Sequence, residues 1–322
     1  MEIFSLANIF NMSEKEIYYV SNNISKHYQK ASIPKKSGGT RTLHIPNKKL
    51  IYMQRIILNE FLSEYKISKS ATAYHKGSTL ASNAIPHIKK KYILKLDIKD
   101  FFGSITFNRV YKMFSAHFPV KYAKLFTELC CYNDKLVQGT PTSPAISNII
   151  MLDFDNRIEK YCKENNISYT RYCDDITLSA DFPLNSAYYK IKKELRKIGL
   201  ELNKNKTHFV KHTHQQRITG IVVNEKIQTP IEYRRKLKQE LYYLYKFGAN
   251  NVIFRNNYTD YISNGITLDE KYINSLLGKI NYVLQIDPEN STFLKEKEKL
   301  CNYRKQLPKV KIKENEDGQY FI

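Results

Sequence analysis

ISYTRYCDDITLSA, residues 167–180, is the stretch that decides the fold. Apolar and polar residues alternate on both sides of its centre, which is the pattern of two half-buried strands. The strands would form a hairpin whose tip carries Cys173, Asp174 and Asp175. Two neighbouring carboxylates repel each other unless a cation lies between them, and Mg²⁺ prefers such oxygen ligands. An ordinary solvent-exposed acidic turn is the competing interpretation, because paired aspartates are common.

The segments around this hairpin predict a ferredoxin-like sheet. Their order is strand, insertion with a helix, strand, strand, helix, strand, which is the split βαβ arrangement and leaves one sheet face free for a ligand. Ser143 with Pro144 predicts a helix start, and Gly199 predicts a helix end. The expected elements besides the hairpin are a strand at 92–98, a helix following Ser143, a helix at 185–198, and strands at 206–211 and 217–223.

Asp97 lies near the end of the expected strand YILKLDI and adds a third carboxylate beside the pair. Three carboxylates at one end of a sheet can hold two metal ions about 3.5–4 Å apart. Such a site supports in-line nucleotidyl transfer without a protein nucleophile.

The two ends of the chain predict mainly helices. Ser13 and Glu16 have the spacing of a capping box, and Gly38-Gly39 predicts a hairpin turn within KKSGGTRTLHIP, residues 35–46. Composition changes after Pro230, so residues 226–322 are taken as a helical module separate from residues 1–225. The expected helices lie at 13–30, 47–65, 78–91, about 237–247, about 273–287 and 291–304.

Charge favours a polyanionic partner. The chain has 52 Lys+Arg against 31 Asp+Glu, a formal net charge of +21. A basic surface of this size suits nucleic acid or an acidic membrane. The 25 Tyr and 16 Phe residues suit base stacking, although half-buried strands and helices use them equally well.

Cysteine usage argues against a zinc ribbon or a disulfide framework. The five cysteines form no CxxC pair and are odd in number, which favours a reducing compartment. No stretch approaches the ~18 apolar residues of a membrane span, and the N-terminus lacks a basic start followed by a long apolar run. A cytoplasmic protein without a membrane partner is expected.

Four ordered motifs resemble those of reverse transcriptases: LKLDIKDFFGSI (94–105), QGTPTSPAISN (138–148), YCDD (172–175) and GLELNKNKT (199–207). The resemblance covers roughly residues 35–225. It implies an α+β right-hand polymerase fold with fingers, a ferredoxin-like palm and an α-helical thumb. The palm core would lie at about 92–103 and 145–225, and the thumb and tail at 226–322.

The resemblance also implies roles for single residues. Asp97, Asp174 and Asp175 would bind two Mg²⁺ ions, with Mn²⁺ as a possible substitute, and the Ile98 carbonyl would be an extra ligand. Asp100 is excluded because it points elsewhere along the strand end. Lys206 resembles a lysine that protonates pyrophosphate, although a solvated lysine is an equal alternative.

The incoming deoxynucleotide (dNTP) would contact five further residues by the same resemblance. Phe102 matches the ring that packs beneath the sugar and rejects a 2′-OH, unless it is plain core packing. Gln138 and Gly139 match the loop against which the nucleotide rests, where glycine permits close approach. Lys36 and Arg41 resemble the basic pair that grips the triphosphate, with Lys35 as the competitor of Lys36.

Two shorter boxes narrow the resemblance to bacterial retron reverse transcriptases. NAIPH (83–87) resembles the NAxxH box, and RITG (217–220) resembles the VTG box with Ile218 in place of valine. The resemblance then implies reverse transcription of a cognate structured non-coding RNA, primed from an internal guanosine 2′-OH. The product would be branched, RNA-linked multicopy single-stranded DNA (msDNA). A separate effector protein in an anti-phage defence complex is also implied, with a higher-order assembly as an option.

RNA contacts are expected at both boxes and on the first helix of the thumb. Asn83 and His87 would be RNA contacts or supports behind the site, with a local polar cap as the alternative. The other candidates are Arg217, Thr219, Tyr233, Arg234, Arg235, Lys236 and Lys238, with base stacking by Tyr242, Tyr243 or Tyr245. His208, His212 and His214 lack a metal-ligand pattern and favour a wet basic surface.

Two rival functions remain open at this level. One is another bacterial reverse transcriptase, either group II intron-like or diversity-generating. The other is a non-catalytic RNA-binding scaffold on a polymerase fold, against which the three carboxylates count because a scaffold has no use for a repulsive acidic cluster.

Overall fold

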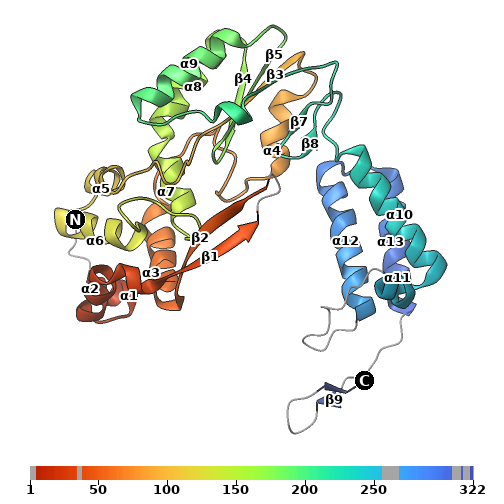
Figure 1. Ribbon diagram of the computed structural model, residues 1–322, viewed down its shortest axis with the longest axis horizontal. Coiled ribbons are helices and arrows are strands. Elements are labelled where there is room, and N and C mark those ends of the chain that lie inside the picture. The colour runs from red at the N-terminus through yellow and green to blue at the C-terminus, as the bar shows by residue number, and fades with distance from the viewer. Residues whose placement is uncertain (1–4, 35–37, 256–267, 307–312, 315–319, 322) are drawn as a thin grey trace. The chain divides into compact units, whose positions relative to one another are not determined.

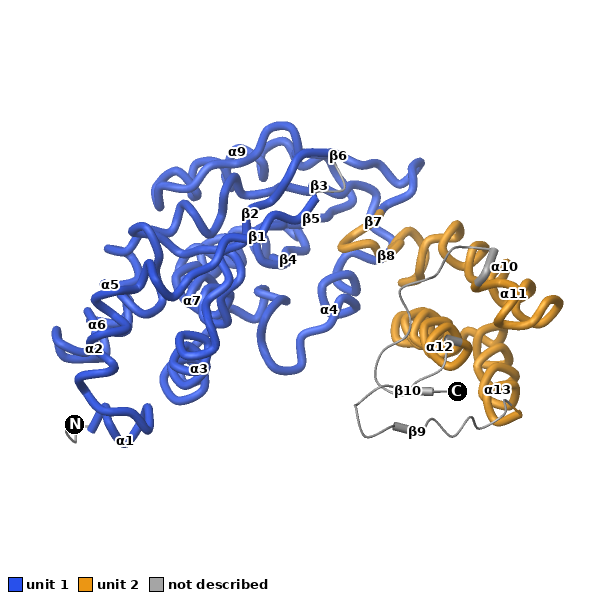
Figure 2. Tube along the Cα trace, turned by 60° about the horizontal axis from the view of Figure 1, so that its bottom comes forward, with its two compact units in different colours: residues 1–216 blue, residues 217–322 orange. Residues whose placement is uncertain are grey.

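The computed structural model describes residues 5–34, 38–255, 268–306, 313–314 and 320–321. The chain divides into two compact units, residues 1–216 and residues 217–322 (Figure 2). No helix in the described ranges is long and apolar enough to cross a membrane. All five cysteines are free thiols, and four of them are buried.

A four-stranded antiparallel sheet forms the centre of the first unit (Figure 1). Its strands lie in the order β4-β5-β3-β6, which is the order of a ferredoxin-like fold, so the predicted split βαβ arrangement is confirmed. The strands are β3 (Tyr92–Asp97), β4 (Ser168–Tyr172), β5 (Asp175–Ala180) and β6 (His208–Lys211).

One face of this sheet is apolar and carries the main core. Leu94 pairs with Leu178, and Leu96 pairs with Ile176, and all four side chains are buried. Two helices lie side by side along the sheet (Figure 1) and contribute to the same core. They are α8 (Leu152–Glu164) and α9 (Asn185–Lys197).

The other face is polar because the alternate residues of the same strands point to it. Asp97 pairs with Asp175, and Lys95 pairs with Thr177, across β3 and β5. Part of this face is covered, over β4 and β5, by α4 (Leu80–Ala84) and the 3₁₀ turn η3 (Ile85–His87). The expectation that the whole face is free for a ligand is therefore wrong, and a cavity opens at its end near Asp97.

The helix expected after Ser143 is broken into two. α7 (Ser143–Ile150) ends where Met151 turns the backbone, and α8 then begins. The N-cap of α7 is Thr142, one residue earlier than expected. The Thr140 hydroxyl accepts a hydrogen bond from the Ser143 N–H at 3.2 Å. A stripe of apolar residues cannot reveal such a break, because both halves keep the helical period.

The N-terminal part of the chain forms short helices and a long hairpin whose strands are mostly exposed. Ser13 and Glu16 form the predicted capping box, and the hairpin predicted at Gly38-Gly39 joins strands that pair from Tyr28↔Pro46 to Pro34↔Thr40. The elements are α1 (Leu6–Phe10), α2 (Glu14–Asn22), η1 (Ile24–His27), β1 (Tyr28–Pro34), β2 (Thr40–Pro46), α3 (Lys48–Ile56) and the π-helical η2 (Ile57–Leu62). The insertion after β3 adds α5 (Phe107–Ser115) and α6 (Val120–Cys130), and the 3₁₀ turn η4 (Lys204–Lys206) precedes β6.

The second unit is mainly helical and has its own core. Leu237, Leu241 and Leu244 of one helix pack with Ile273 and Leu276 of another. The helices are α10 (Ile231–Phe247), α11 (Ala249–Arg255), α12 (Leu268–Ile286) and α13 (Ser291–Gln306). Two short strands, β9 (Lys313–Glu314) and β10 (Tyr320–Phe321), pair with each other.

Residues 217–223 do not form the single strand that was expected. They form a tight hairpin of β7 (Arg217–Ile218) and β8 (Ile221–Val222), which belongs to the second unit and not to the four-stranded sheet. Both turn residues have positive φ, 45° at Thr219 and 85° at Gly220. A two-residue turn with positive φ favours glycine, so Thr219 and Gly220 interrupt the apolar residues of segment 217–223.

Candidate active site

The three aspartates meet at the open end of the polar sheet face. Asp97 is the last residue of β3, and Asp175, the first of β5, is its direct partner in the register. Asp174 lies in the turn, where its carbonyl accepts the Ile98 N–H at 3.0 Å. The structure therefore places the three aspartates that the sequence singled out at neighbouring backbone positions.

The left-handed conformation of Cys173 makes this turn possible. Its φ is +60°, and its side chain is buried. Because a non-glycine residue adopts this conformation only at some cost, neighbouring contacts must hold the turn.

Burial and mutual repulsion raise the pKa values of the Asp174 and Asp175 carboxyls. Loss of water around Asp175, then repulsion from Asp174 and Asp97, raises the pKa of its carboxyl to about 6. Burial raises the pKa of Asp174 as well, and Asp97 adds to that shift. The Lys206 ammonium lies 2.6 Å from Asp97 Oδ2, and this hydrogen bond raises the lysine pKa. The site thus favours additional positive charge.

Carboxylate oxygens are the ligands that Mg²⁺ prefers, so the chemistry of the donor set fits a hard dication. Within the described ranges, however, no three His, Cys, Asp or Glu side chains are grouped closely enough to hold a metal ion. One Asp97 oxygen is instead engaged by Lys206. A metal would have to compete with this ammonium for Asp97.

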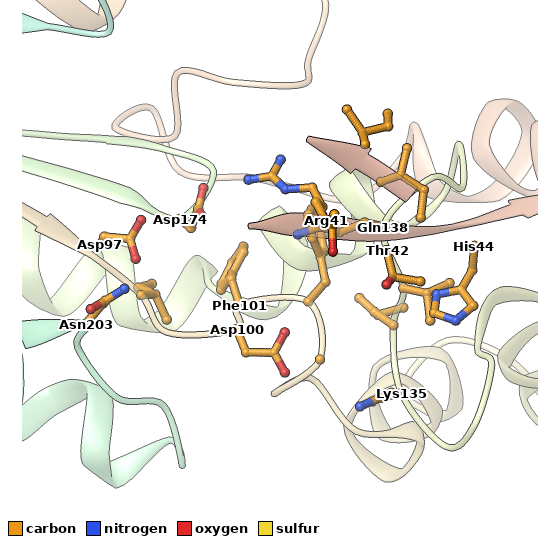
Figure 3. A pocket seen from close by; sticks show the side chains of 18 of the residues that line it. Arg41, Thr42, His44, Asp97, Asp100, Phe101, Lys135, Gln138, Asp174 and Asn203 are labelled. Carbon is orange, nitrogen blue, oxygen red and sulfur yellow. The ribbon is translucent and has the colours of Figure 1, made fainter. Parts of the chain in front are cut away.

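A cavity of about 940 Å³ opens beside Asp97 and Asp174 (Figure 3). The cavity is lined by five further residues that were expected near the nucleotide or metal, namely Ile98, Phe102, Gln138, Lys206 and Arg41 of β2. Its size suits a nucleotide, since ligand pockets commonly span 300–1,000 Å³. Lys36 and its competitor Lys35 lie outside the described residues.

Asp100, which was excluded as a metal ligand, also lines this cavity, and the sequence did not predict that position. Asp100 lies three residues after the end of β3 and has a φ of +42°. Figure 3 shows its carboxylate turned away from Asp97 and Asp174. Further lining residues that the sequence did not single out are Thr42, His44, Phe101, Lys135 and Asn203. They come from four separate segments, so no local pattern could have grouped them.

Gln138 and Gly139, which follow the insertion, contact the β1–β2 hairpin. The Gln138 carbonyl accepts the His44 N–H at 2.9 Å. Gly139 has a φ of +110°, and a Cβ added there would lie 2.8 Å from the His44 carbonyl oxygen. The close approach that requires glycine is thus between two protein backbones.

Asn83 and His87 do not reach the surface, so the expectation of direct RNA contact is wrong. His87 is fully buried, and its Nδ1 and Nε2 lie 2.7 Å from Ser179 Oγ and 2.9 Å from Thr170 Oγ1. Asn83 is buried too, and its Oδ1 accepts from the Thr72 hydroxyl at 2.8 Å. Their arrangement fits the alternative of supports behind the site.

Stability should depend on pH through His87. Burial lowers the pKa of the folded imidazole from 6.5 to about 3, so between these values only the unfolded chain takes up the proton. The stabilisation is therefore complete above pH 6.5 and decreases as pH falls, by about 2 kcal/mol between pH 6.5 and pH 5. Urea unfolding of the wild type and His87→Gln should show this extra pH dependence only in the wild type. His208→Gln, at an exposed histidine of β6, is the control, and equal pH slopes in all three proteins would contradict the prediction.

The second unit carries the remaining candidates for RNA contact, in unequal positions. Arg217 pairs with Glu232, and Arg234 donates to Gln228 Oε1 at 2.8 Å. Thr219 lies in the β7–β8 turn, and Tyr233 is partly buried against Tyr282. The exposed candidates on α10 are Arg235, Lys236 and Lys238, with Tyr242 and Tyr243 further along the helix.

Helix α10 also carries a cation–π cluster that the sequence pattern did not predict. Lys246 Nζ lies 5.5 Å from the Tyr242 ring centroid and 5.4 Å from that of Phe247. His208, His212 and His214 are exposed on and after β6.

Comparison with known proteins gives these features a family. The family described as "Reverse transcriptase (RNA-dependent DNA polymerase)" matches residues 33–223. Retron Mx65 reverse transcriptase of Myxococcus xanthus is 34% identical over 238 residues, 67% of this chain and 56% of that protein. Retron Ec86 and Ec83 reverse transcriptases of Escherichia coli are 32% and 31% identical, over 64% and 81% of this chain.

The match spans 56% and 65% of the lengths of the Mx65 and Ec86 proteins and 84% of the Ec83 protein. Among solved structures, telomerase from Candida albicans with a fragment of telomeric RNA is similar at a TM-score of 0.46 and 11% identity, covering 88% of this chain and 59% of that one. The sequence matches show that the chain belongs to the reverse transcriptase family, with its right-hand polymerase fold, and within it to the retron reverse transcriptases.

Proposed function

We propose that this chain is an RNA-directed DNA polymerase that acts at Asp97, Asp174 and Asp175. The observation that carries the proposal is the position of Asp97, Asp174 and Lys206 in the lining of a cavity of nucleotide size, with Asp175 paired to Asp97 in the strand register. Residues 1–225 would supply fingers and palm, and residues 226–322 a helical thumb and tail.

Two Mg²⁺ ions, or Mn²⁺ in their place, would be held by the three carboxylates with the Ile98 carbonyl as an additional oxygen ligand. When bound, the ions would activate the attacking hydroxyl and stabilise the leaving pyrophosphate. Removal of divalent ions with a chelator should abolish DNA synthesis on an RNA template, and addition of Mg²⁺ or Mn²⁺ should restore it. Synthesis that continues without divalent ions would refute this part.

The side chains around the cavity would divide the remaining work. Arg41, together with Lys36, would grip the triphosphate through charge-assisted hydrogen bonds. Gln138 would form part of the wall against which the base rests, and Gly139 would hold this wall against the His44 backbone. Lys206, whose ammonium donates to Asp97, would donate a proton to the leaving pyrophosphate.

Phe102 would select deoxynucleotides by excluding a 2′-OH. The ring is 9% exposed and lines the cavity, so it is neither fully packed nor free. Replacing it with alanine should raise the ratio of ribonucleotide to deoxynucleotide kcat/KM roughly 10- to 100-fold. Steady-state incorporation of GTP and dGTP gives this ratio.

Phe101→Ala is the comparison, because Phe101 is the adjacent ring, lines the same cavity, is 3% exposed and loses similar packing, but is not the ring expected beneath the sugar. If both variants change the ratio equally, or neither changes it, Phe102 is only a packing residue.

The retron relatives support a finer proposal for the substrate. The enzyme would reverse-transcribe its cognate structured non-coding RNA from an internal guanosine 2′-OH and produce branched msDNA. The exposed cations Arg235, Lys236 and Lys238 of α10 would contact RNA phosphates. A separate effector protein and a role in anti-phage defence complete this proposal.

Sequencing of copurifying nucleic acid tests the retron type. The protein should be purified from cells that carry the gene with its flanking DNA. We expect DNA joined to RNA through a 2′–5′ branch, and a debranching enzyme should release the DNA. A protein active on RNA templates but free of any branched species would favour another class of bacterial reverse transcriptase.

A further inference from the structure

Arg171 is the largest fully buried side chain of the described residues. It lies on β4 in phase with Tyr169, so its side chain belongs to the apolar face that the helices cover. Its Nε and Nη2 donate to the two carboxylate oxygens of Asp155 on α8, at 2.8 and 2.6 Å. The Tyr169 hydroxyl donates to the same carboxylate at 2.6 Å, so both charges are paired and hydrogen-bonded.

The third nitrogen of the guanidinium points to the catalytic turn. Arg171 Nη1 donates to the Cys173 carbonyl at 3.0 Å and to Asn148 Oδ1 at 3.1 Å. The Cys173 carbonyl belongs to the peptide that links Cys173, at φ +60°, to Asp174. One side chain therefore fixes the residue whose unusual conformation presents the two aspartates.

The same network extends to a second segment beside the turn. Asn148 Nδ2 donates to the Ala73 carbonyl at 2.8 Å, directly before Tyr74, which also has a φ of +60°. The Arg171 backbone pairs with this segment as well, through Ser70 and Thr72 at 2.7 and 2.8 Å. Tyr74 consequently lies with its ring 6.3 Å from that of Tyr172.

A buried ion pair is a poor device for stability alone, because desolvation of two charges offsets most of their attraction. The planar guanidinium offers something an apolar residue cannot, namely fixed donors in three directions. Two left-handed residues at one site, each held through a carbonyl, indicate that geometry is what the network supplies.

We propose that Arg171, with Asp155 and Asn148, is a positioning residue that sets the Cys173 turn so that Asp174 and Asp175 are placed for divalent metal. The inference rests on the proposed function of these two aspartates. Loss of the Arg171 Nη1 contacts frees the turn to relax, and a shift near 1 Å at a reacting group costs roughly 100-fold in rate.

The test separates positioning from stability with two variants. Arg171→Lys keeps a cation near Asp155 but loses the planar fork. The triple variant Asp155→Leu, Tyr169→Phe, Arg171→Met removes both charges and the dependent hydroxyl while keeping volume, a change that often preserves stability. Arg157→Lys is the matched control, since Arg157 also pairs with a buried carboxylate, Glu194, but has no contact with the turn.

Mn²⁺ binding to the full chain, measured by electron paramagnetic resonance, is the readout that does not depend on activity. The thermal midpoint, kcat and the KM for dNTP are measured in parallel. We expect both Arg171 variants to bind Mn²⁺ roughly tenfold or more weakly and to lose kcat roughly 100-fold with a nearly unchanged KM. Arg157→Lys should match the wild type.

A folded variant with wild-type Mn²⁺ affinity and kcat would overturn the proposal and leave the network purely structural. Should the triple variant fail to fold, Arg171→Lys decides by the same criterion. Asn148→Ala removes the link to Ala73 and one of the two Arg171 Nη1 contacts but leaves the contact with the Cys173 carbonyl, so it is expected to show a smaller loss of the same kind. Failure of the proposed function is distinguishable, because the wild type itself would then bind no Mn²⁺ or would lose nothing on Asp174→Asn.

Discussion

The Asp174→Asn protein should lose RNA-templated DNA synthesis almost completely, with kcat reduced roughly 1000-fold or more. Asparagine keeps the size of the side chain and one oxygen but removes the negative charge that attracts a dication. The neighbouring carboxylates that raise the pKa of Asp175 would then repel less, so the loss cannot be assigned to new repulsion. Primer extension on an RNA template with Mg²⁺ measures the effect.

Asp153→Asn is the control for this substitution. Asp153 is an exposed aspartate of α8 in the same unit and takes no part in the proposed site. Both variants should retain the wild-type thermal midpoint within a few degrees. Undiminished synthesis by Asp174→Asn would remove Asp174 from the metal site, and an equal loss in Asp153→Asn would show that the effect is not local.

The Asp155→Ala substitution should have the largest effect on stability, lowering the free energy of unfolding of the first unit by about 3–5 kcal/mol. It leaves the guanidinium of Arg171 buried without its counter-charge, and the Tyr169 hydroxyl loses its acceptor. Both side chains of the ion pair are fully buried, so the guanidinium lies away from bulk solvent when its partner is removed. Urea unfolding followed by circular dichroism measures the difference.

Asp153→Ala provides the comparison, because it removes a carboxylate from the same first turn of α8 at an exposed position. We expect a change within about 1 kcal/mol there. Similar values for the two substitutions would mean that the ion pair is solvated in solution and that the network around Arg171 is not formed.

Local sequence patterns predicted many of the strands, turns and helix caps of the fold. The alternation in residues 92–98 and 167–180 predicted β3 and the β4–β5 hairpin, and Gly38-Gly39 predicted the turn between β1 and β2. These elements are determined by residues close in sequence: strand alternation, turn glycines and capping side chains. Ser13 with Glu16 is of the same kind.

Features that depend on tertiary contacts could not be predicted in this way. The burial of His87 depends on Thr170 and Ser179, which lie more than 80 residues away. Similarly, the separation of β7 and β8 from the main sheet depends on which strands they pair with, not on their own apolar content. Gly139 was expected to admit a nucleotide, yet the backbone it approaches is that of His44.

The candidate site shows the same division. Asp97, Asp174 and Asp175 were singled out as residues, and the register of β3 with β5 brings them together. Arg171 was overlooked, although its phase with Tyr169 already assigns a charged side chain to the apolar face. A charged residue at such a position needs a partner, and this requirement is a signal that a sequence can supply.

Anomalous diffraction from crystals grown with Mn²⁺ tests the central claim most directly, namely that the three aspartates form a two-metal site. The account predicts two Mn²⁺ peaks about 3.5–4 Å apart, in contact with Asp97, Asp174 and Asp175, with Lys206 displaced from Asp97 and no peak at Asp100. Absence of any peak between these carboxylates, or a peak held by Asp100 instead, would contradict it.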